Sequence, residues 1–393
     1  MKQRFYIQKL AIVNALGNGV EEVSARLFMG DTSGMVLEDG LLLNGQARVG
    51  RVSHALMTVP EQLINFNCRN NQLLLTALVQ IEEAVTHAIS RYGRTRVGVV
   101  LGSSTSGMAE GEVAFASLKQ HGTLPLHYRY SQQEIGAPAV FLARYLNLGG
   151  PAYTISTACT SSAKAFQSAR NLLQHGICDV VLVGGVDSLC RTTVNGFASL
   201  ESISTELTNP MSVNRAGINI GEGAALFLLG KEEADIELLG IGESSDAYHM
   251  SAPHPEGLGA EQAMQLALND AGIVANNVGY LNLHATATFK NDEMESKAVA
   301  RVFPSGMPAS GTKPLTGHTL GAAGAMELAF CFFALQENKL PPHKWDGMPD
   351  LTLPKLDLVN ENQTFKSNTK RICMSNSFAF GGSNTSLIIA ESC

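Results

Sequence analysis

The stretch YTISTACTSSAKAFQSARNLLQHGICDVVLV, residues 153–183, decides the fold class. Tyr153–Ala158 has the composition of a strand, and Thr160–His175 carries apolar residues at the spacing of one helix face. Val180–Val183 is a second apolar strand. Strand, helix and strand in this order form the unit of a parallel sheet, so the sequence predicts an α/β protein.

Similar elements are predicted along the rest of the chain. RVGVVLG, residues 96–102, is a short apolar run that ends in a loop rich in glycine and serine, which is typical of a buried strand entering a functional edge. The second half is predicted to contain one strand, two helices and two terminal strands, at Tyr280–Leu283, Glu293–Val302, Gly321–Gln336 and around Phe378–Asn384.

The length predicts two parts. Because 393 residues are too many for one ordinary hydrophobic core, we expect an N-terminal half, residues 1–233, and a C-terminal half, residues 234–393. The boundary is placed between Gly230 and Glu237, with no flexible linker.

Composition and charge exclude several classes of protein. The net charge of −7, without a cluster of lysine and arginine, argues against a nucleic-acid-binding protein. The N-terminal residues 1–19 interrupt their apolar run at Gln8, Lys9 and Asn14, which indicates a strand and a turn rather than a signal peptide. No segment reaches the roughly 18 uninterrupted apolar residues of a membrane span.

The cysteines indicate a reduced compartment. Seven of them are scattered through the chain, at positions 68, 159, 178, 190, 331, 373 and 393. They form no CxxC pair and no Cys/His spacing that is typical of a zinc site. The sequence therefore predicts no metal site and a cytoplasmic location.

Cys159 is the candidate nucleophile. It lies in STACTSSAKAF, between an apolar strand and the first turn of a helix, where unpaired N–H groups and the helix dipole favour a thiolate. The small neighbours Ala158 and Thr160 leave room for a thioester substrate. The alternative is a small buried core residue, the usual role of a free cysteine.

Two later segments carry further candidate active-site residues. His284 ends an apolar strand in LNLHATATFKND, and Lys313 and His318 lie in a glycine-rich loop before a helix, in SGTKPLTGHTLGAAGAMEL. The ends of such elements are where active-site groups gather in enzymes built on sheets. For a single histidine, a structural or surface role is the alternative.

With these segments identified, the chain resembles the β-ketoacyl synthases, condensing enzymes of the thiolase superfamily in fatty-acid and polyketide synthesis. Four motifs carry the resemblance: TACTSSAKA, HATAT, TKPLTGHTLGAAGAME and NSFAFGGSN. It covers nearly the whole chain and implies a thiolase-like fold of two similar halves in α-β-α-β-α layers. The residues match the elongating Cys-His-His branch rather than the initiating Cys-His-Asn branch.

The resemblance implies a reaction in two steps. Cys159 takes an acyl group from an acyl carrier protein, and a carbanion made by decarboxylating malonyl-carrier protein attacks the acyl-enzyme. Backbone N–H groups of Cys159 and Phe380 are expected to hold the oxyanion of the first step. Two neutral imidazoles, His284 and His318, are expected to donate hydrogen bonds to the enolate of the second step.

Other roles are also implied by the resemblance. Lys313 is expected to pair with Glu327, either as a structural salt bridge or to orient the histidines and adjust their pKa values. Thr286 and Thr288 resemble the threonines that hold the pantetheine arm. The remaining candidates are a supporting network and the walls of the acyl pocket, assigned to Asn291, Asp292, Glu295, Met108 and Phe380.

The chain departs from the family pattern at four positions. Ala285 and Ala287 replace the usual glycines of the histidine motif, and Ala379 replaces the first glycine of the C-terminal turn. Each adds a Cβ where the backbone normally runs close to substrate or needs a permissive φ. Ser212, in PMSVNRAG, stands where aspartate is more common. With the short length, these alanines are similar to those of ketosynthases of aryl polyene pigment pathways.

The expected partners follow from the resemblance. Substrates arrive on the phosphopantetheine of an acyl carrier protein, so no other cofactor is expected. Arg69, Lys344 and Arg371 are candidates for docking an acidic carrier, although a solvated side chain is the commoner role for each. The chain is expected to form a homodimer, or a heterodimer with a ketosynthase-like chain-length factor.

Two alternatives of different function remain. A partner subunit of chain-length-factor type would lack the active cysteine, whereas Cys159 is present. A coenzyme A-dependent thiolase would need a second catalytic cysteine in a CxG setting near the C-terminus, and neither Cys373 nor Cys393 has that setting.

Overall fold

The computed structural model describes residues 3–366 and 370–392, so Cys393 lies outside the described residues. The strands of the N-terminal half lie in the order β1-β9-β7-β5-β6. Their bounds are β1 (Tyr6–Asn14), β5 (Val97–Gly102), β6 (Ala152–Ile155), β7 (Val180–Asp187) and β9 (Gly223–Gly230), with β2 (Gly17–Asn18) paired to β1.

The strands of the C-terminal half lie in the order β13-β12-β11-β14-β15-β10. Their bounds are β10 (Ile236–Ser245), β11 (Tyr280–Asn282), β12 (Pro308–Ser310), β13 (Asp357–Leu358), β14 (Ile372–Phe378) and β15 (Ser383–Glu391). β1 and β10 pair through Tyr6 with Glu237 and Ile7 with Ile236, which joins the two halves in one 12-stranded sheet.

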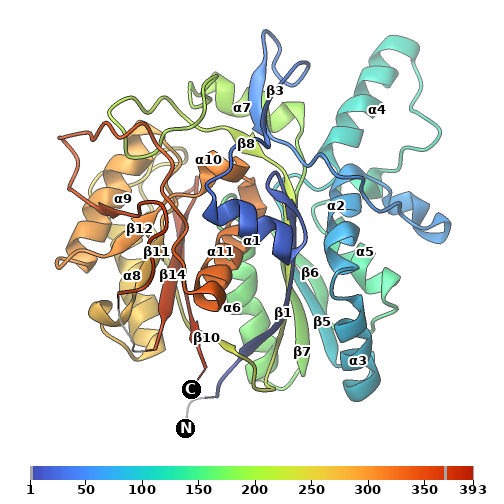
Figure 1. The fold of residues 1–393 in the computed structure, drawn as a ribbon. Coiled ribbons are helices and arrows are strands. Elements are labelled where there is room, and N and C mark those ends of the chain that lie inside the picture. The colour runs from blue at the N-terminus through green and yellow to red at the C-terminus, as the bar shows by residue number, and fades with distance from the viewer. Residues whose placement is uncertain (1–2, 367–369, 393) are drawn as a thin grey trace.

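Helices form three layers around these strands, as Figure 1 shows. The central layer consists of α6 (Ser161–Gln174) and α11 (Ala323–Glu337). The outer layers are α2 (Arg69–Leu78), α3 (Glu82–Tyr92) and α5 (Ala137–Tyr145) on one side, and α8 (Leu258–Ala271) and α9 (Phe289–Val302) on the other. The predicted α-β-α-β-α layers are therefore confirmed.

Smaller elements lie around this frame. They are α1 (Val20–Phe28), α4 (Met108–His121), α7 (Arg191–Ser199), α10 (Lys313–Thr316), a three-stranded sheet of β3 (Met35–Glu38), β4 (Ala47–Gly50) and β8 (Ile220–Gly221), and the 3₁₀ turns η1 (Glu61–Phe66), η2 (Tyr130–Gln132), η3 (Ala275–Asn277) and η4 (Leu320–Ala322).

The central helix α11 is apolar on all sides because both halves of the sheet pack against it. Leu320–Glu337 has the length and hydropathy of a membrane span, yet 89% of this segment is buried inside the protein. It is therefore the core helix of the fold. The bent helix pair Arg69–Leu78 and Glu82–Tyr92 passes the same test of length and composition only when counted together.

The predicted elements are present, with shifts at their ends. The helix expected from Glu293 begins four residues earlier, at Phe289, and the strand expected to reach Ala158 ends at Ile155. Ala158 has a left-handed φ of 52°, which cannot continue a strand and turns the chain immediately before Cys159. The predicted boundary at residue 233 falls in the loop between β9 and β10, and its position stays a prediction.

Candidate active site

Cys159 lies in the turn between β6 and α6. Thr160 Oγ1 donates a hydrogen bond to the carbonyl of Thr157 at 2.7 Å, and Ser161 Oγ donates one to the carbonyl of Ala158 at 2.5 Å. These bonds fix the turn with the cysteine 7% exposed. The side chain is therefore held at the start of the central helix and is only just accessible.

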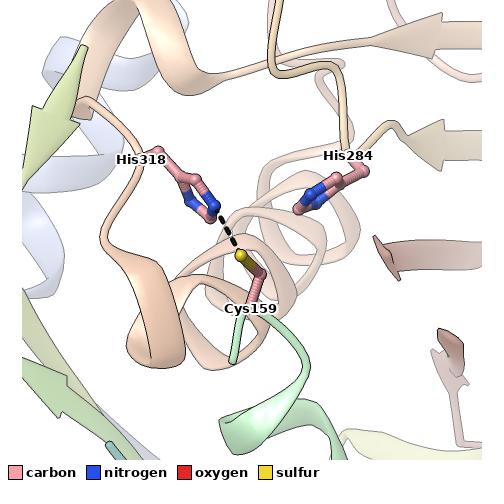
Figure 2. A group of neighbouring side chains, drawn as sticks. All are labelled: Cys159, His284 and His318. Carbon is pink, nitrogen blue, oxygen red and sulfur yellow. Dashed lines mark hydrogen bonds between the residues drawn. The ribbon is translucent and has the colours of Figure 1, made fainter. Parts of the chain in front are cut away.

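His318 contacts the nucleophile directly. Its Nε2 lies 3.0 Å from Cys159 Sγ (Figure 2). The backbone N–H of His318 donates to the carbonyl of Asn219 at 2.7 Å, and Gly221 N–H donates to the carbonyl of His318 at 2.9 Å. The histidine is thus fixed by backbone bonds to the N-terminal half.

His284 faces the same sulfur from the C-terminal half (Figure 2). The two imidazole rings have centroids 5.4 Å apart and planes at 85°. Lys313 Nζ lies 3.5 Å from His284 Nδ1 and donates to the carbonyl of His284. Since an ammonium group only donates, Nδ1 is the acceptor, and the proton of the neutral ring lies on Nε2.

Burial decides the protonation state of both histidines. It holds the pKa of His284 and of His318 well below 6.5, and the positive charge of Lys313 lowers both pKa values further. Both imidazoles are therefore neutral at physiological pH. A neutral ring is able both to accept a proton from a thiol and to donate a hydrogen bond to an oxyanion.

Burial also raises the pKa of the Cys159 thiol to about 12, although Lys313 opposes this effect. Burial therefore acts against the thiolate that the helix start was expected to favour. Desolvation of the sulfur outweighs the opposing charge of Lys313, because the side chain is almost completely enclosed. The resting pair is a thiol beside the neutral imidazole of His318, and the proton leaves the sulfur during attack.

The expected pair of Lys313 and Glu327 is present and buried, with side chains 2% and 4% exposed. Burial raises the pKa of Glu327 to about 7, against the opposing effect of Lys313. Lys313 contacts the carbonyl of His284 as well, so it joins the core helix α11 to the histidine loop.

Two buried carboxylates on α9 hold the loop His284–Thr288. Glu295 accepts the N–H groups of His284 and Ala285, both at 2.7 Å, and Asp292 accepts the N–H of Ala287 at 3.1 Å. Burial raises the pKa of both acids, that of Glu295 to about 7. The network expected around the histidine loop is therefore formed: the two carboxylates bind the loop backbone, and Asn291 Nδ2 donates to Asp292 at 3.2 Å.

The unusual alanines have different consequences. Ala285 and Ala287 adopt left-handed φ values of 39° and 61°, the conformation for which glycine is ordinarily required. Ala379 is not among the described residues with positive φ. In the C-terminal turn that contains Ala379, the residues with positive φ are Gly381 and Gly382. Ser212 Oγ donates to Asp346 at 2.9 Å, a contact that an aspartate at position 212 would turn into repulsion.

A cavity of about 410 Å³ leads to this group. Thr286 and Thr288 line it, with their hydroxyl oxygens 2.9 Å apart, and Phe380 lines it with its ring centroid 5.4 Å from that of Phe197. Met108, the first residue of α4, does not line this cavity within one chain. Its expected place in the acyl pocket stays a prediction that needs the second subunit.

Several functional-site residues were missed from the sequence. Phe197, Leu200 and Ile218 line the cavity, as do the charged residues Glu201 and Lys290. The apolar residues of the segment around α7 were the available signal. No sequence pattern brings this segment to the His284 loop, which lies far along the chain.

Asp187 was also missed. Its carboxylate is fully buried and accepts hydrogen bonds from Ser103 Oγ at 2.9 Å, Thr105 N at 2.7 Å and Ala322 N at 3.1 Å. It therefore ties the loop after β5 to the start of α11, beside the active site. Burial raises the pKa of Asp187 to about 6.

The three basic candidates for carrier docking are engaged in ion pairs. Arg69 pairs with Glu222, Lys344 with Glu361 at 2.8 Å, and Arg371 with Glu391. None of the three lines the cavity. Each charge is thus paired within the chain, whereas the alternative was a solvated side chain, and a role of the three in carrier docking stays a prediction.

The ligand atoms of Cys159, His284 and His318 all lie within 4.8 Å of one another. One thiol and two imidazoles are also a donor set that suits zinc. The prediction that the site holds no metal therefore depends on the family assignment and not on the donor set.

Comparison with known proteins gives that assignment. Residues 63–234 match the family model "Beta-ketoacyl synthase, N-terminal domain", and residues 236–344 match "Beta-ketoacyl synthase, C-terminal domain". Nodulation protein E of Rhizobium meliloti is 32% identical over 82% of this chain and 83% of its own length. The 3-oxoacyl-[acyl-carrier-protein] synthase 2 of Coxiella burnetii is 34% identical over 77% of each chain.

Solved structures support the same family assignment. A chain of the complex "Ketosynthase (ApeO) in Complex with its Chain Length Factor (ApeC)" from Xenorhabdus doucetiae is 46% identical, with a TM-score of 0.95 over 99% of this chain and 98% of that chain. A β-ketoacyl synthase from Burkholderia phymatum is 30% identical, with a TM-score of 0.87 over the full length of both chains. The chain therefore belongs to the β-ketoacyl synthase family and is an elongating 3-oxoacyl-[acyl-carrier-protein] synthase with the triad Cys159, His284 and His318.

Proposed function

We propose that this chain extends an acyl group in a specialised polyketide pathway of the aryl polyene type, together with an acyl carrier protein and a chain-length-factor subunit. The observation that carries the chemistry is the group of one buried thiol and two neutral imidazoles, with Sγ and the Nε2 of His318 at 3.0 Å. The altered alanines and the 46% identity to a chain of a ketosynthase and chain-length-factor complex support the pathway and the partner.

The first step transfers the acyl group. His318 Nε2 takes the proton of Cys159 as Sγ attacks the thioester carbonyl, and the backbone N–H groups of Cys159 and Phe380 receive the oxyanion. When the tetrahedral intermediate collapses, the bond to the carrier sulfur breaks. The proton on His318 then passes to the departing pantetheine thiol, so the histidine is neutral again.

The second step forms the carbon–carbon bond. The malonyl carboxylate leaves as carbon dioxide, and the electron pair moves into an enolate whose oxygen accepts hydrogen bonds from Nε2–H of His284 and from His318 in the tautomer with its proton on Nε2. The enolate carbon attacks the acyl carbonyl on Cys159, and Sγ departs as a thiolate. The thiolate then takes a proton that is supplied by water, which restores the resting thiol. Lys313 does not contact the reacting atoms in this scheme. It acts by orienting His284 and by keeping both imidazoles neutral.

A variant that separates the two steps tests this scheme. Cys159→Gln places an amide where the acyl-enzyme carbonyl would lie, so malonyl-carrier protein should still lose carbon dioxide while no β-ketoacyl product forms. Release of carbon dioxide and product formation are measured in the same reaction by labelled malonyl carbon and by mass spectrometry. A Cys159→Gln enzyme that still makes product would refute the role of Cys159.

The partner is tested separately. Co-expression with a ketosynthase-like subunit lacking the cysteine should give a one-to-one complex in light scattering, with higher condensation activity than this chain alone. A homodimer with full activity would instead support the homodimeric assembly. The cytoplasmic location remains a prediction, and fractionation of cells that express the full chain tests it.

A further inference from the structure

Lys290 is the basic side chain at the rim of the substrate cavity. It lies in the first turn of α9, it is exposed, and it lines the same cavity as Cys159 and His284. The other charged residue in the lining is Glu201, since both histidines are neutral. The cavity therefore has one positive group to offer to an anionic ligand.

The charge of Lys290 has no partner carboxylate among residues 3–366 and 370–392, since no carboxylate oxygen there forms an ion pair with its Nζ. Arg215 stacks on the ring of the neighbouring Phe289 at 4.9 Å but is 5% exposed and paired with Asp350 at 2.6 Å. Lys290 thus differs from Arg215, whose charge is already paired with a carboxylate.

The substrate has a matching charge. A thioester that reaches Cys159 on a phosphopantetheine arm carries a phosphate ester at the far end of that arm. A charged phosphate is costly to bury unpaired, so it must stay at the mouth of the cavity while the thioester enters. The amide and thioester end passes Thr286 and Thr288, whose hydroxyl groups line the same cavity.

We propose that Lys290 binds the phosphate group of the phosphopantetheine arm at the mouth of this cavity. The inference rests on the proposed function, because it assumes a thioester carried on such an arm. Lysine suits this role as a compact, mobile point charge. Lys290 is therefore a positioning residue, since it acts at the arm and not at the reacting carbonyl.

The experiment compares small thioester donors that carry the same acyl group and differ at the phosphate end of the pantetheine arm. The full-length enzyme, with its partner subunit if that is required, is acylated on Cys159 by the same acyl group on pantetheine, on 4′-phosphopantetheine and on coenzyme A. We expect kcat/KM for phosphopantetheine to exceed that for pantetheine by about two- to fivefold, as an exposed charge pair allows. This preference should shrink as salt is raised.

Substitutions at one helix provide the controls. Lys290→Gln should abolish the preference by lowering kcat/KM for phosphopantetheine more than for pantetheine, Lys290→Glu should reverse it, and Lys290→Arg should keep it. Lys297→Gln removes the same charge from the same helix, where Lys297 pairs with Glu256 and Glu293 and does not line the cavity. It should keep the preference.

The possible results distinguish a failure of the phosphate contact from a failure of the proposed function. A wild-type enzyme without preference, or a Lys290→Gln enzyme that loses activity equally with all three donors, would overturn the phosphate contact while leaving the proposed function intact. No acylation of Cys159 by any thioester would overturn the proposed function and this inference together. A preference for coenzyme A above phosphopantetheine, lost in Lys290→Gln, would support the contact and identify coenzyme A as the donor.

Discussion

The two histidines of the active site are held by different means. His318 depends on main-chain bonds to Asn219 and Gly221, which belong to the N-terminal half. His284 depends on charged side chains of the C-terminal half, with Glu295 on its N–H and Lys313 on its carbonyl. The position of His318 therefore reports how the two halves pack, whereas that of His284 reports a buried charge network.

The difference extends to chemistry. His318 Nε2 lies against the thiol, while Lys313 fixes the proton of His284 on Nε2, the atom that can donate to an oxyanion. His318 is thus equipped for both steps and His284 for the second. This assignment is finer than the sequence supports, because HATAT and TKPLTGHT give no sign of which imidazole contacts the sulfur.

The largest expected effect separates the two rings. His284→Ala and His318→Ala should each slow malonyl decarboxylation on the order of a hundredfold or more, because each removes a donor to the enolate. His318→Ala should also slow acylation of Cys159, whereas His284→Ala should leave acylation within about twofold. Stopped reactions that count labelled carbon dioxide and acyl-enzyme measure the two steps. Equal acylation defects in both variants would refute the difference between the histidines.

The next effect concerns the stability that the buried ion pair of Lys313 and Glu327 contributes. Lys313→Met leaves the Glu327 carboxylate buried without its partner, so the free energy of unfolding should fall by about 3 kcal/mol in urea titration. The double variant Lys313→Met with Glu327→Leu removes both charges and should recover most of this loss. If the double variant were as unstable as the single one, the pair would not be the source of the effect.

The pH dependence gives a third test. Because the pKa values of both histidines lie well below 6.5, both imidazoles should stay neutral between pH 8 and pH 6.5, so any change in decarboxylation by Cys159→Gln in this range reports Glu295 and Glu327, whose pKa values are about 7. At lower pH the imidazoles gain protons and the acid limb appears. Lys313→Met removes a positive charge that lowers both pKa values, so its acid limb should move to higher pH. A shift to lower pH would contradict the proposed effect of Lys313.

Much of the fold and of the active site was predictable from the sequence. The features that were not predictable depend on tertiary packing. Short apolar runs and a helical spacing predicted the strands and helices, and four motifs predicted the triad and the pair of Lys313 with Glu327. The raised pKa of Cys159 was not predictable, since burial depends on tertiary packing. The same is true of Asp187, whose partners come from three separate segments, and of Lys290, which has no pattern around it.

The smallest expected effect concerns the left-handed alanines. Ala287→Gly relieves the steric cost of φ 61° but adds freedom to the unfolded chain, so the free energy of unfolding should change by less than about 1 kcal/mol. Gly311 offers a contrast, because a Cβ there would lie 2.5 Å from the Cβ of Ala285. Gly311→Ala should therefore destabilise the protein, and Ala285→Gly should partly restore it. Thermal unfolding of Ala287→Gly, of Gly311→Ala and of the double variant Gly311→Ala with Ala285→Gly measures both effects.

The identity of the nucleophile is the central claim, and intact-protein mass spectrometry tests it most directly. After incubation with an acyl-carrier protein, the wild-type chain should gain the mass of one acyl group, and peptide mapping should place it on Cys159. Cys159→Ala should gain no mass and make no condensation product, while keeping the wild-type unfolding transition. An acyl group on another residue, or condensation by Cys159→Ala, would contradict the account.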